Sequence, residues 1–283
     1  MKANRTAIYL LVPTVAVFSI LLVLPLVNIL QESFRVFVPG RVGSAADAPL
    51  TFANYAELGR SAYFFFFYDT LRIGLVATFI GLSIGYPIAY HVARLRASRV
   101  RRLWVGFLIA MMFLSVLVRV YSIALTFGPV GFLRQITAFV GLDSSGPTVT
   151  EALVIFGLLH YLIPISALTL VGTIQNVNPR LAEAAQALGA ARWYAHLTIT
   201  IPLSMRGILS AFLICYTLCI SAFVIPMVLG KGRILFVSNL IFSRFSEVSN
   251  YPSGSAISIL MLVLSLMLIY LVSRVASARW QRV

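Results

Sequence analysis

The chain has 283 residues, of which 60% are apolar and only 11% are charged. A soluble globular fold of this length has no means of burying so much apolar surface, so lipid must be its main solvent. The net charge of +14 arises from 22 Lys and Arg residues against 8 Asp and Glu residues, and it calls for an explanation from membrane topology or from an acidic partner.

Six apolar segments are long enough to cross a bilayer, because a helical span needs about 20 apolar residues. Backbone groups in hydrocarbon must be satisfied within each segment, and these segments are far longer than the strands of a membrane barrel. We therefore predict an all-α integral membrane protein with six transmembrane helices. The segments lie near residues 7–30, 70–93, 104–126, 152–174, 203–229 and 256–275.

The first apolar segment follows the letters MKANR and stays apolar for about 24 residues, with no small-x-small cleavage site at its end. We expect a retained helix within residues 1–33 rather than a secretion signal. The remaining chain then divides into an extracytoplasmic loop at 34–69, a core at 70–276 and a tail at 277–283.

The basic residues gather on one side of the predicted bundle, where Glu183 is the only acidic residue. A Lys and Arg excess marks the cytoplasmic face, so we expect both termini and the loops after the second and fourth helices in the cytoplasm. The charge is then mainly topological, and the cluster RLRASRVRR has no aromatic platform that would indicate nucleic acid. The bases on this side are Lys2, Arg5, Arg94, Arg96, Arg99, Arg101, Arg102, Arg180, Arg192, Arg206, Arg274, Arg279 and Arg282.

Few ionisable residues lie within the predicted helices, where each is costly to insert. Arg72 follows Asp69 by three residues, so it can pair with that carboxylate or extend to the interface. Arg119 lies toward the outer interface and either anchors its helix or contacts solute. For His160, deeper in the fourth helix, packing is favoured over a role as ligand or proton relay.

Two cysteines, Cys215 and Cys219, are four residues apart on one face of the fifth predicted helix. In a lipid-embedded segment this spacing favours small packing residues over a disulfide or a metal pair. We therefore predict no metal site.

The stretch from 178 to 202 differs from the apolar segments on either side of it. Asn178 can cap a helix, Pro179 suits a first helical position, and Gly189 is a typical left-handed stop. We expect a cytoplasmic helix of two to three turns that either docks on another protein or packs on its own bundle, because so short a helix is marginal alone. Its alanines have small side chains, so another protein could approach the helix closely.

The letters EAAQALGAARWYAHLTITIP resemble the EAA loop of type I ABC importer permeases, in which EAA is followed at set spacings by Gly, Ile, an aliphatic residue and Pro. In that family the short helix is a coupling helix that docks in a cleft on a separate ATPase. The resemblance implies a six-helix permease bundle with a cytoplasmic coupling helix. The residues implied in ATPase coupling are Arg180, Glu183, Ala184, Ala185, Leu188, Gly189, Arg192 and Pro202.

Three further segments, at 113–133, 221–230 and 238–259, are similar to permeases of the spermidine/putrescine class. This implies a polyamine or another small polar solute, although Ala222 stands where many such permeases carry an acidic residue. We expect Pro226 to kink the fifth helix near its outer end. The residues implied in the solute pathway are Arg119, Tyr121, Ser221, Phe223 and Pro226.

The chain contains no GxxxxGK[ST] phosphate loop, so ATP hydrolysis must occur on another polypeptide. The resemblance implies an ABC ATPase dimer that holds ATP and Mg, a second permease that is identical or related, and an extracytoplasmic solute-binding protein. No cofactor is expected on this chain, which would lie in a bacterial cytoplasmic (inner) membrane. Amphipathic stretches at 130–142 and 233–245 are candidate docking sites for the binding protein, or caps on the bundle.

Two alternatives come from other classes of protein. An ion-driven secondary transporter would need no ATPase, but it typically shows more spans and more polar mid-membrane helices. An intramembrane serine protease would need a Ser and a His facing each other, for which Ser253 or Ser255 with His160 are the loose candidates.

Overall fold

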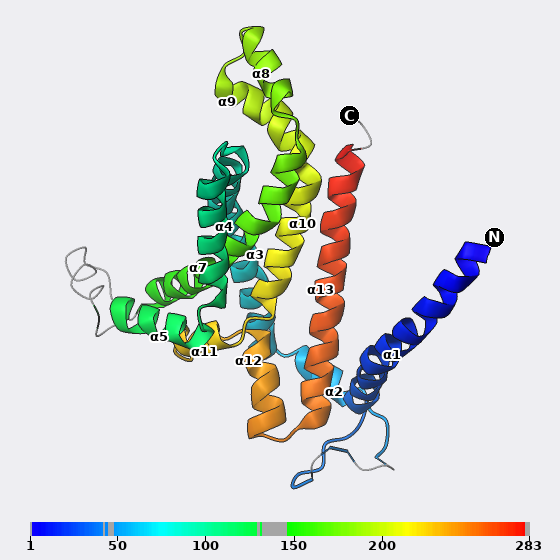
Figure 1. Ribbon diagram of the computed structural model, residues 1–283. Coiled ribbons are helices and arrows are strands. Elements are labelled where there is room, and N and C mark those ends of the chain that lie inside the picture. Colours follow the sequence, from blue (N-terminus) through cyan, green and yellow to red (C-terminus); the bar gives the residue numbers. More distant parts are fainter. Residues whose placement is uncertain (1, 42, 45–47, 129–130, 132–145, 281–283) are drawn as a thin grey trace. The chain divides into compact units, whose positions relative to one another are not determined.

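The computed structural model describes residues 2–41, 43–44, 48–128, 131 and 146–280, and the regular secondary structure among these is helical, with one isolated bridge between Arg35 and Leu50. Figure 1 shows the helices in chain order. The longer ones are α1 (Lys2–Ser33), α3 (Ser61–Arg94), α4 (Ser98–Phe113), α5 (Val116–Phe127), α7 (Pro147–Asn176), α10 (Ile201–Ile220) and α13 (Tyr251–Trp280). The shorter ones are α2 (Ala53–Leu58), α8 (Pro179–Ala187), α9 (Arg192–Ala195), α11 (Val224–Leu229) and α12 (Val237–Phe242), with π-helical turns at His196–Thr200 and Ser243–Glu247.

Five helices in the described part of the chain are long and apolar enough to cross a membrane. The pair α4 and α5 passes the same test together, although its two helices are bent by 85°. The number of spans is therefore five, or six if the bent pair is counted as one. The all-α membrane fold expected from composition is confirmed.

The chain divides into two compact units. The first comprises Met1–Phe65 and Leu240–Leu266. In it, the Asn54 side-chain amide donates to the carbonyl oxygens of Ser33 and Arg35, both at 2.9 Å, and so ties α2 to the end of α1. Arg244 donates to the hydroxyl of Tyr63. The Arg244 guanidinium also lies 3.9 Å from the Glu57 carboxylate.

The second unit comprises Phe66–Asn239 and Met267–Val283, and its core lies among α3, α5, α7, α10 and α11. Small residues let these helices approach closely, as is usual for helices packed in lipid. A Cβ on Gly157 would lie 2.6 Å from a methyl of Leu229, and a Cβ on Gly207 would overlap Thr173. The side chains that fill this core include Ile73, Leu158, Leu162, Cys215, Cys219, Leu229 and Phe236.

The loop expected at 34–69 is shorter than predicted, because α3 begins at Ser61 rather than near residue 70. The aromatic residues before Asp69 form the first turns of α3, whereas the prediction placed them in the loop before the helix. The Glu32 carboxylate, at the end of α1, accepts from the backbone N–H and the hydroxyl of Ser44 in the loop, at 2.8 and 2.7 Å.

The third predicted span, 104–126, corresponds to the bent pair α4 and α5 and is not one continuous helix. Leu114 and Ser115 are extended, with ψ of 129° and 132°, and they separate α4 from α5. Neither Pro nor Gly marks the break in the sequence. The Arg119 side chain instead stabilises the break, because it donates to the freed carbonyl oxygens of Met111 and Leu114 at 2.7 and 2.8 Å.

The fifth predicted helix, 203–229, is also wrong in its bounds. The helix runs from Arg192 to Ile220 and ends before Pro226, which lies in the separate helix α11. Pro226 therefore does not kink this helix. Pro202 lies within the continuous helix Arg192–Ile220. A proline ring normally clashes with the carbonyl oxygen four residues earlier in an α-helix, and here the π-helical turn just before Pro202 widens the backbone and relieves that clash.

Candidate functional site

Helix α8 is fixed at its start by local chemistry. Asn178 is extended and its side-chain oxygen accepts from the backbone N–H of Arg180 at 3.0 Å, while Pro179 occupies the first helical position. The cap satisfies one of the N–H groups that a helix start leaves without a partner, and proline has no N–H to satisfy. The predicted start of the helix is confirmed.

The end of α8 is fixed by Gly189, whose φ of +93° is rarely adopted by other residues. The Gly189 N–H donates to the Gln186 carbonyl, and the Ala190 N–H donates to the Ala185 carbonyl, both at 3.0 Å. These two bonds form a Schellman motif, which closes the last turn. The sequence Pro179 to Gly189 therefore specifies a helix of fixed length.

The surface of α8 is open, since none of its residues is buried. Figure 1 shows α8 and α9 together at one end of α7 and α10. Leu188 is 91% exposed and Leu181 is 47% exposed, and on α9 Trp193 and Tyr194 are 67% and 53% exposed. We call these four residues the α8 patch. An exposed apolar patch of this kind is typical of a protein docking surface.

The remaining residues predicted in coupling lie on or close to this patch. Arg180, Glu183 and Ala184 are exposed on α8, and Ala185 is half-buried. Arg192 is exposed at the first position of α9, whereas Pro202 is half-buried in the first turn of α10. The structure thus gathers the predicted set, except Pro202, at one end of the second unit.

The predicted pathway residues are only partly brought together. Arg119 and Phe223 line a cavity of about 270 Å³, together with Tyr161, Ala222 and Leu218. Tyr161 donates to the Leu218 carbonyl at 3.1 Å. The other three predicted pathway residues lie outside this lining: Tyr121 is 54% exposed on α5, Ser221 is exposed at the end of α10, and Pro226 is buried in α11.

Arg119 is 4% exposed and the described chain provides no carboxylate for it. Two backbone carbonyl oxygens accept from its Nη2, as given above, while its Nε has no partner among the described residues. The arginine therefore anchors the break between α4 and α5 and also borders the cavity. His160, on α7, is half-buried.

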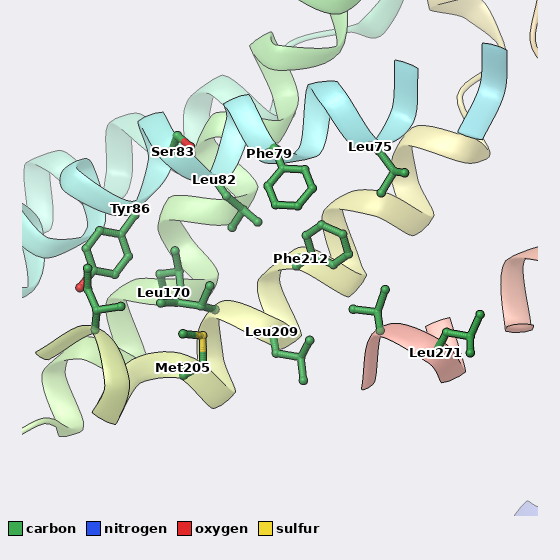
Figure 2. Close-up of a pocket in the computed structure, with 13 residues that line it drawn as sticks. Leu75, Phe79, Leu82, Ser83, Tyr86, Leu170, Met205, Leu209, Phe212 and Leu271 are labelled. Carbon is green, nitrogen blue, oxygen red and sulfur yellow. The ribbon is translucent and has the colours of Figure 1, made fainter. Parts of the chain in front are cut away.

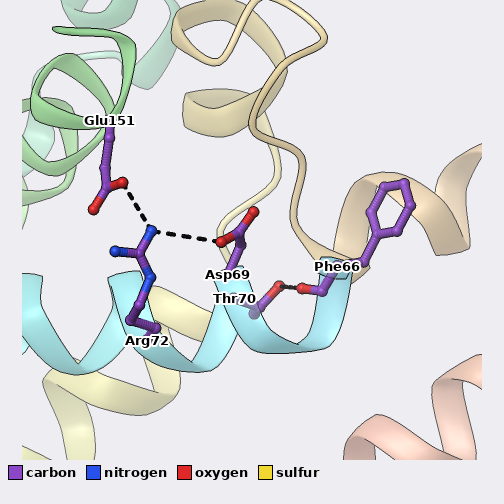
Figure 3. Close-up of polar contacts among 5 residues, drawn as sticks. All are labelled: Phe66, Asp69, Thr70, Arg72 and Glu151. Atoms are coloured by element: carbon purple, nitrogen blue, oxygen red, sulfur yellow. Dashed lines mark hydrogen bonds and ion pairs between the residues drawn. The ribbon is translucent and has the colours of Figure 1, made fainter. Parts of the chain in front are cut away.

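Arg72 forms a charge cluster that joins α3 to α7 (Figure 3). Its guanidinium lies 2.8 Å from the Glu151 carboxylate and 3.5 Å from that of Asp69. Next to it, Thr70 donates to the Phe66 carbonyl at 2.6 Å and accepts from the backbone N–H of Val237 at 2.9 Å. Pairing with Asp69 was one of the two alternatives that the spacing of three residues left open for Arg72.

Sequence reasoning missed Glu151 and Tyr161 as partners at these sites. The signal for Glu151 was weak but present, because both Glu151 and Arg72 fall near the same end of their predicted helices. Nothing in the spacing placed Tyr161 beside Ala222. Of the two amphipathic stretches, 130–142 lies outside the described residues apart from Gly131, and 233–245 contains α12 and part of the π-helical turn after it.

Comparisons with known proteins agree on one class of protein. A family model described as binding-protein-dependent transport system inner membrane component matches residues 77–282. The spermidine/putrescine transport system permease protein PotB of Haemophilus influenzae is 32% identical over 228 residues, 80% of this chain and 79% of that one. PotB of Escherichia coli K12 is 31% identical, over 77% of this chain and 80% of that one.

Solved structures show the same fold at low identity. A chain from a bacterial ABC transporter that imports the acidic polysaccharide alginate aligns with a TM-score of 0.74 and 18% identity, covering 98% of this chain and 96% of that one. A chain of the MetNI methionine ABC transporter aligns with a TM-score of 0.56 and 17% identity, over 75% and 93% of the two chains.

Proposed function

The chain belongs to the family of binding-protein-dependent transport system inner membrane components, and from this premise we propose how it works. It is the membrane permease subunit of an ATP-driven importer and not an enzyme by itself. Two permease chains, identical or related, enclose the solute pathway. A solute-binding protein delivers solute on the outer side of the membrane. On the cytoplasmic side, a separate ATPase dimer binds ATP and Mg and closes.

Helix α8 is the element that receives the ATPase motion. The observation that carries this proposal is the α8 patch, because Leu188 exposes nearly its whole side chain on a helix whose two ends are both fixed. Burying such a leucine against a partner would contribute about 1.5–3 kcal/mol. A short helix with fixed ends transmits displacement without fraying, and its small Ala184 and Ala185 let a partner surface approach closely.

The α8 end of the bundle faces the cytoplasm in this proposal. Arg94, at the end of α3, donates to the Val177 carbonyl just before α8 at 3.0 Å, so the basic loop after α3 lies at the same end as α8. Arg180 and Arg192 add further positive charge there. The positive-inside rule assigns such an end to the cytoplasm, and both chain termini would lie on that side.

The solute is a polyamine or another small polar compound. Support for a polyamine comes from the relatives named above, which are spermidine/putrescine permeases. The described lining of the 270 Å³ cavity contains Arg119 and no carboxylate. A polyamine would therefore take its anionic contacts from other surfaces, such as the second permease chain.

Coupling is tested by two substitutions that change α8 without touching the core. Glu183→Lys reverses a charge on the exposed face, and Gly189→Asp places a side chain at a positive φ. We expect both variants to insert normally but to lose solute uptake in proteoliposomes containing ATPase and binding protein. Gln175→Lys, exposed on α7 outside α8, should keep uptake. Wild-type uptake by both α8 variants would contradict the proposal.

The cargo is identified by ligand-stimulated ATP hydrolysis in the reconstituted transporter. Spermidine, putrescine, neutral amino acids and small anions would each be presented with the binding protein. Stimulation by spermidine or putrescine supports the polyamine assignment. Stimulation by an anion alone would reject that assignment while leaving the importer function intact.

A further inference from the structure

Two cavities of the second unit have Tyr86 in both of their linings, near the α8 end of the bundle. The smaller, about 460 Å³, lies between α3, α8 and the start of the helix at Arg192. We call it the head cavity. Aromatic rings form much of its lining, and α8 contributes one polar side chain. The lining residues used here are Tyr86, Tyr90, Gln186, Arg192, Trp193 and His196.

The larger cavity, about 910 Å³, is an apolar groove among α3, α7, α10 and α13. Figure 2 shows Tyr86 at one end of this groove and Leu75 at the other, with Phe212 and Met205 along its length. Ser83 and Tyr86 are the only lining residues of the groove with polar side-chain atoms. Such a surface does not suit a polar solute, but it does suit hydrocarbon.

The groove has the length of one leaflet of a bilayer. Leu75 and Tyr86 are eleven residues apart on α3, which corresponds to about 16 Å at the helical rise. One leaflet contributes half of a hydrocarbon core of about 30 Å. An acyl chain that enters at Tyr86 would therefore reach the bilayer middle near Leu75.

The head cavity offers groups that suit an anion. Arg192 borders it, and Trp193 borders it with an indole ring. The His196 ring is held against Tyr90 at a centroid distance of 4.4 Å. Yet the buried Nδ1 of His196 has no hydrogen-bond partner in the described part of the chain. The head cavity is therefore bordered by both a guanidinium and an imidazole that has an unpartnered nitrogen.

We propose that an anionic phospholipid binds across these two cavities, with its phosphate beside Arg192 and His196 and an acyl chain in the apolar groove. Basic pockets at the cytoplasmic side of membrane helices take such headgroups, because the guanidinium pairs with phosphate and the aromatic rings lie at the interface. The wall that the two cavities share at Tyr86 favours a lipid, because a free phosphate would leave the groove unfilled.

The proposed lipid would also contact the coupling element. Ala182 and Gln186 of α8 border the head cavity. The headgroup would thus contact α8 next to Trp193, which also belongs to the α8 patch. Lipid occupancy would then restrain how far α8 moves against α3.

The test is native mass spectrometry of the full-length chain in mild detergent, with dioleoylphosphatidylglycerol or dioleoylphosphatidylcholine added. We expect one phosphatidylglycerol to be retained per chain in preference to phosphatidylcholine. Arg192→Gln should reduce this preference about fivefold, the effect of one interfacial arginine. Leu209→Trp, which narrows the groove, should reduce retention of both lipids.

Arg99→Gln is the matched control, because Arg99 is an exposed base of the same end that borders neither cavity. It should keep the preference. Equal retention of the two lipids by the wild type would overturn the proposal. So would displacement of phosphatidylglycerol by millimolar inorganic phosphate, or crosslinking of Leu209→Cys to a second permease chain in an assembled transporter that retains no lipid.

Discussion

Gly189 is the residue on which the shape of the coupling helix depends most. Its φ of +93° lies in the left-handed region, where a Cβ costs about 1–2 kcal/mol. A Cβ added there would meet no other atom within 4 Å. The effect of a substitution is therefore conformational and does not involve a clash.

Gly189→Ala should open the end of α8 without unfolding the bundle. The amide protons of Gly189 and Ala190, which donate the two Schellman bonds, should exchange about five- to thirtyfold faster in hydrogen exchange. Gly172→Ala is the control, because a Cβ there also meets nothing within 4 Å and its φ is not positive. Unchanged exchange in Gly189→Ala would show that the glycine does not fix this helix end.

Arg119 has a structural task that is separable from any contact with solute. In Arg119→Met, the carbonyl oxygens of Met111 and Leu114 lose a charged donor. A hydrogen bond to a charged group contributes about 1.5–3 kcal/mol, so we expect a clearly lower midpoint of thermal unfolding in detergent. Arg119→Lys should recover part of the loss. A midpoint equal to that of the wild type would show that Arg119 does not stabilise the break between α4 and α5.

Among the elements, α3 and α7 are joined by the pair Arg72 and Glu151. The Arg72 side chain is 37% exposed and the Glu151 side chain is 28% exposed, so solvent screens the pair and the stabilisation should be modest. A double-mutant cycle with Arg72→Gln and Glu151→Gln should give a coupling free energy below about 1 kcal/mol. A much larger value would indicate a low-dielectric site rather than an interfacial pair.

Elements with strong local signals were predicted well from sequence, whereas elements fixed by contacts between residues farther apart in the chain were not. Helix α8 was predicted with both of its ends, because Asn178, Pro179 and Gly189 each act on the backbone next to them. The break at Leu114 was missed, because it depends on the Arg119 side chain five residues away and not on a helix-breaking residue. Pro226 was misplaced because apolar letters continue past Ser221 without a signal for the helix end.

For the whole molecule, composition was sufficient to predict a helical membrane bundle, and the EAA motif was sufficient to predict the family. Neither could assemble the candidate sites. The head cavity needs α3, α8, α9 and the π-helical turn at His196 to converge, and the 270 Å³ cavity needs Arg119, Tyr161 and Ala222 from three separate segments. Such contacts between distant segments leave no local pattern in an apolar sequence, because leucine in lipid and leucine in a core look alike.

The whole account requires that the α8 end meets a nucleotide-driven partner, and one crosslinking measurement tests this directly. Cys215 and Cys219 are both buried, so a cysteine introduced at Leu188 would be the main reactive thiol. In the assembled transporter, a short bifunctional reagent should join Leu188→Cys to the ATPase, and ATP should change the yield. Leu125→Cys on α5, which is also well exposed, should give no such product. If Leu188→Cys never joined the ATPase, or reacted with an impermeant reagent from outside the cell, the account would be contradicted.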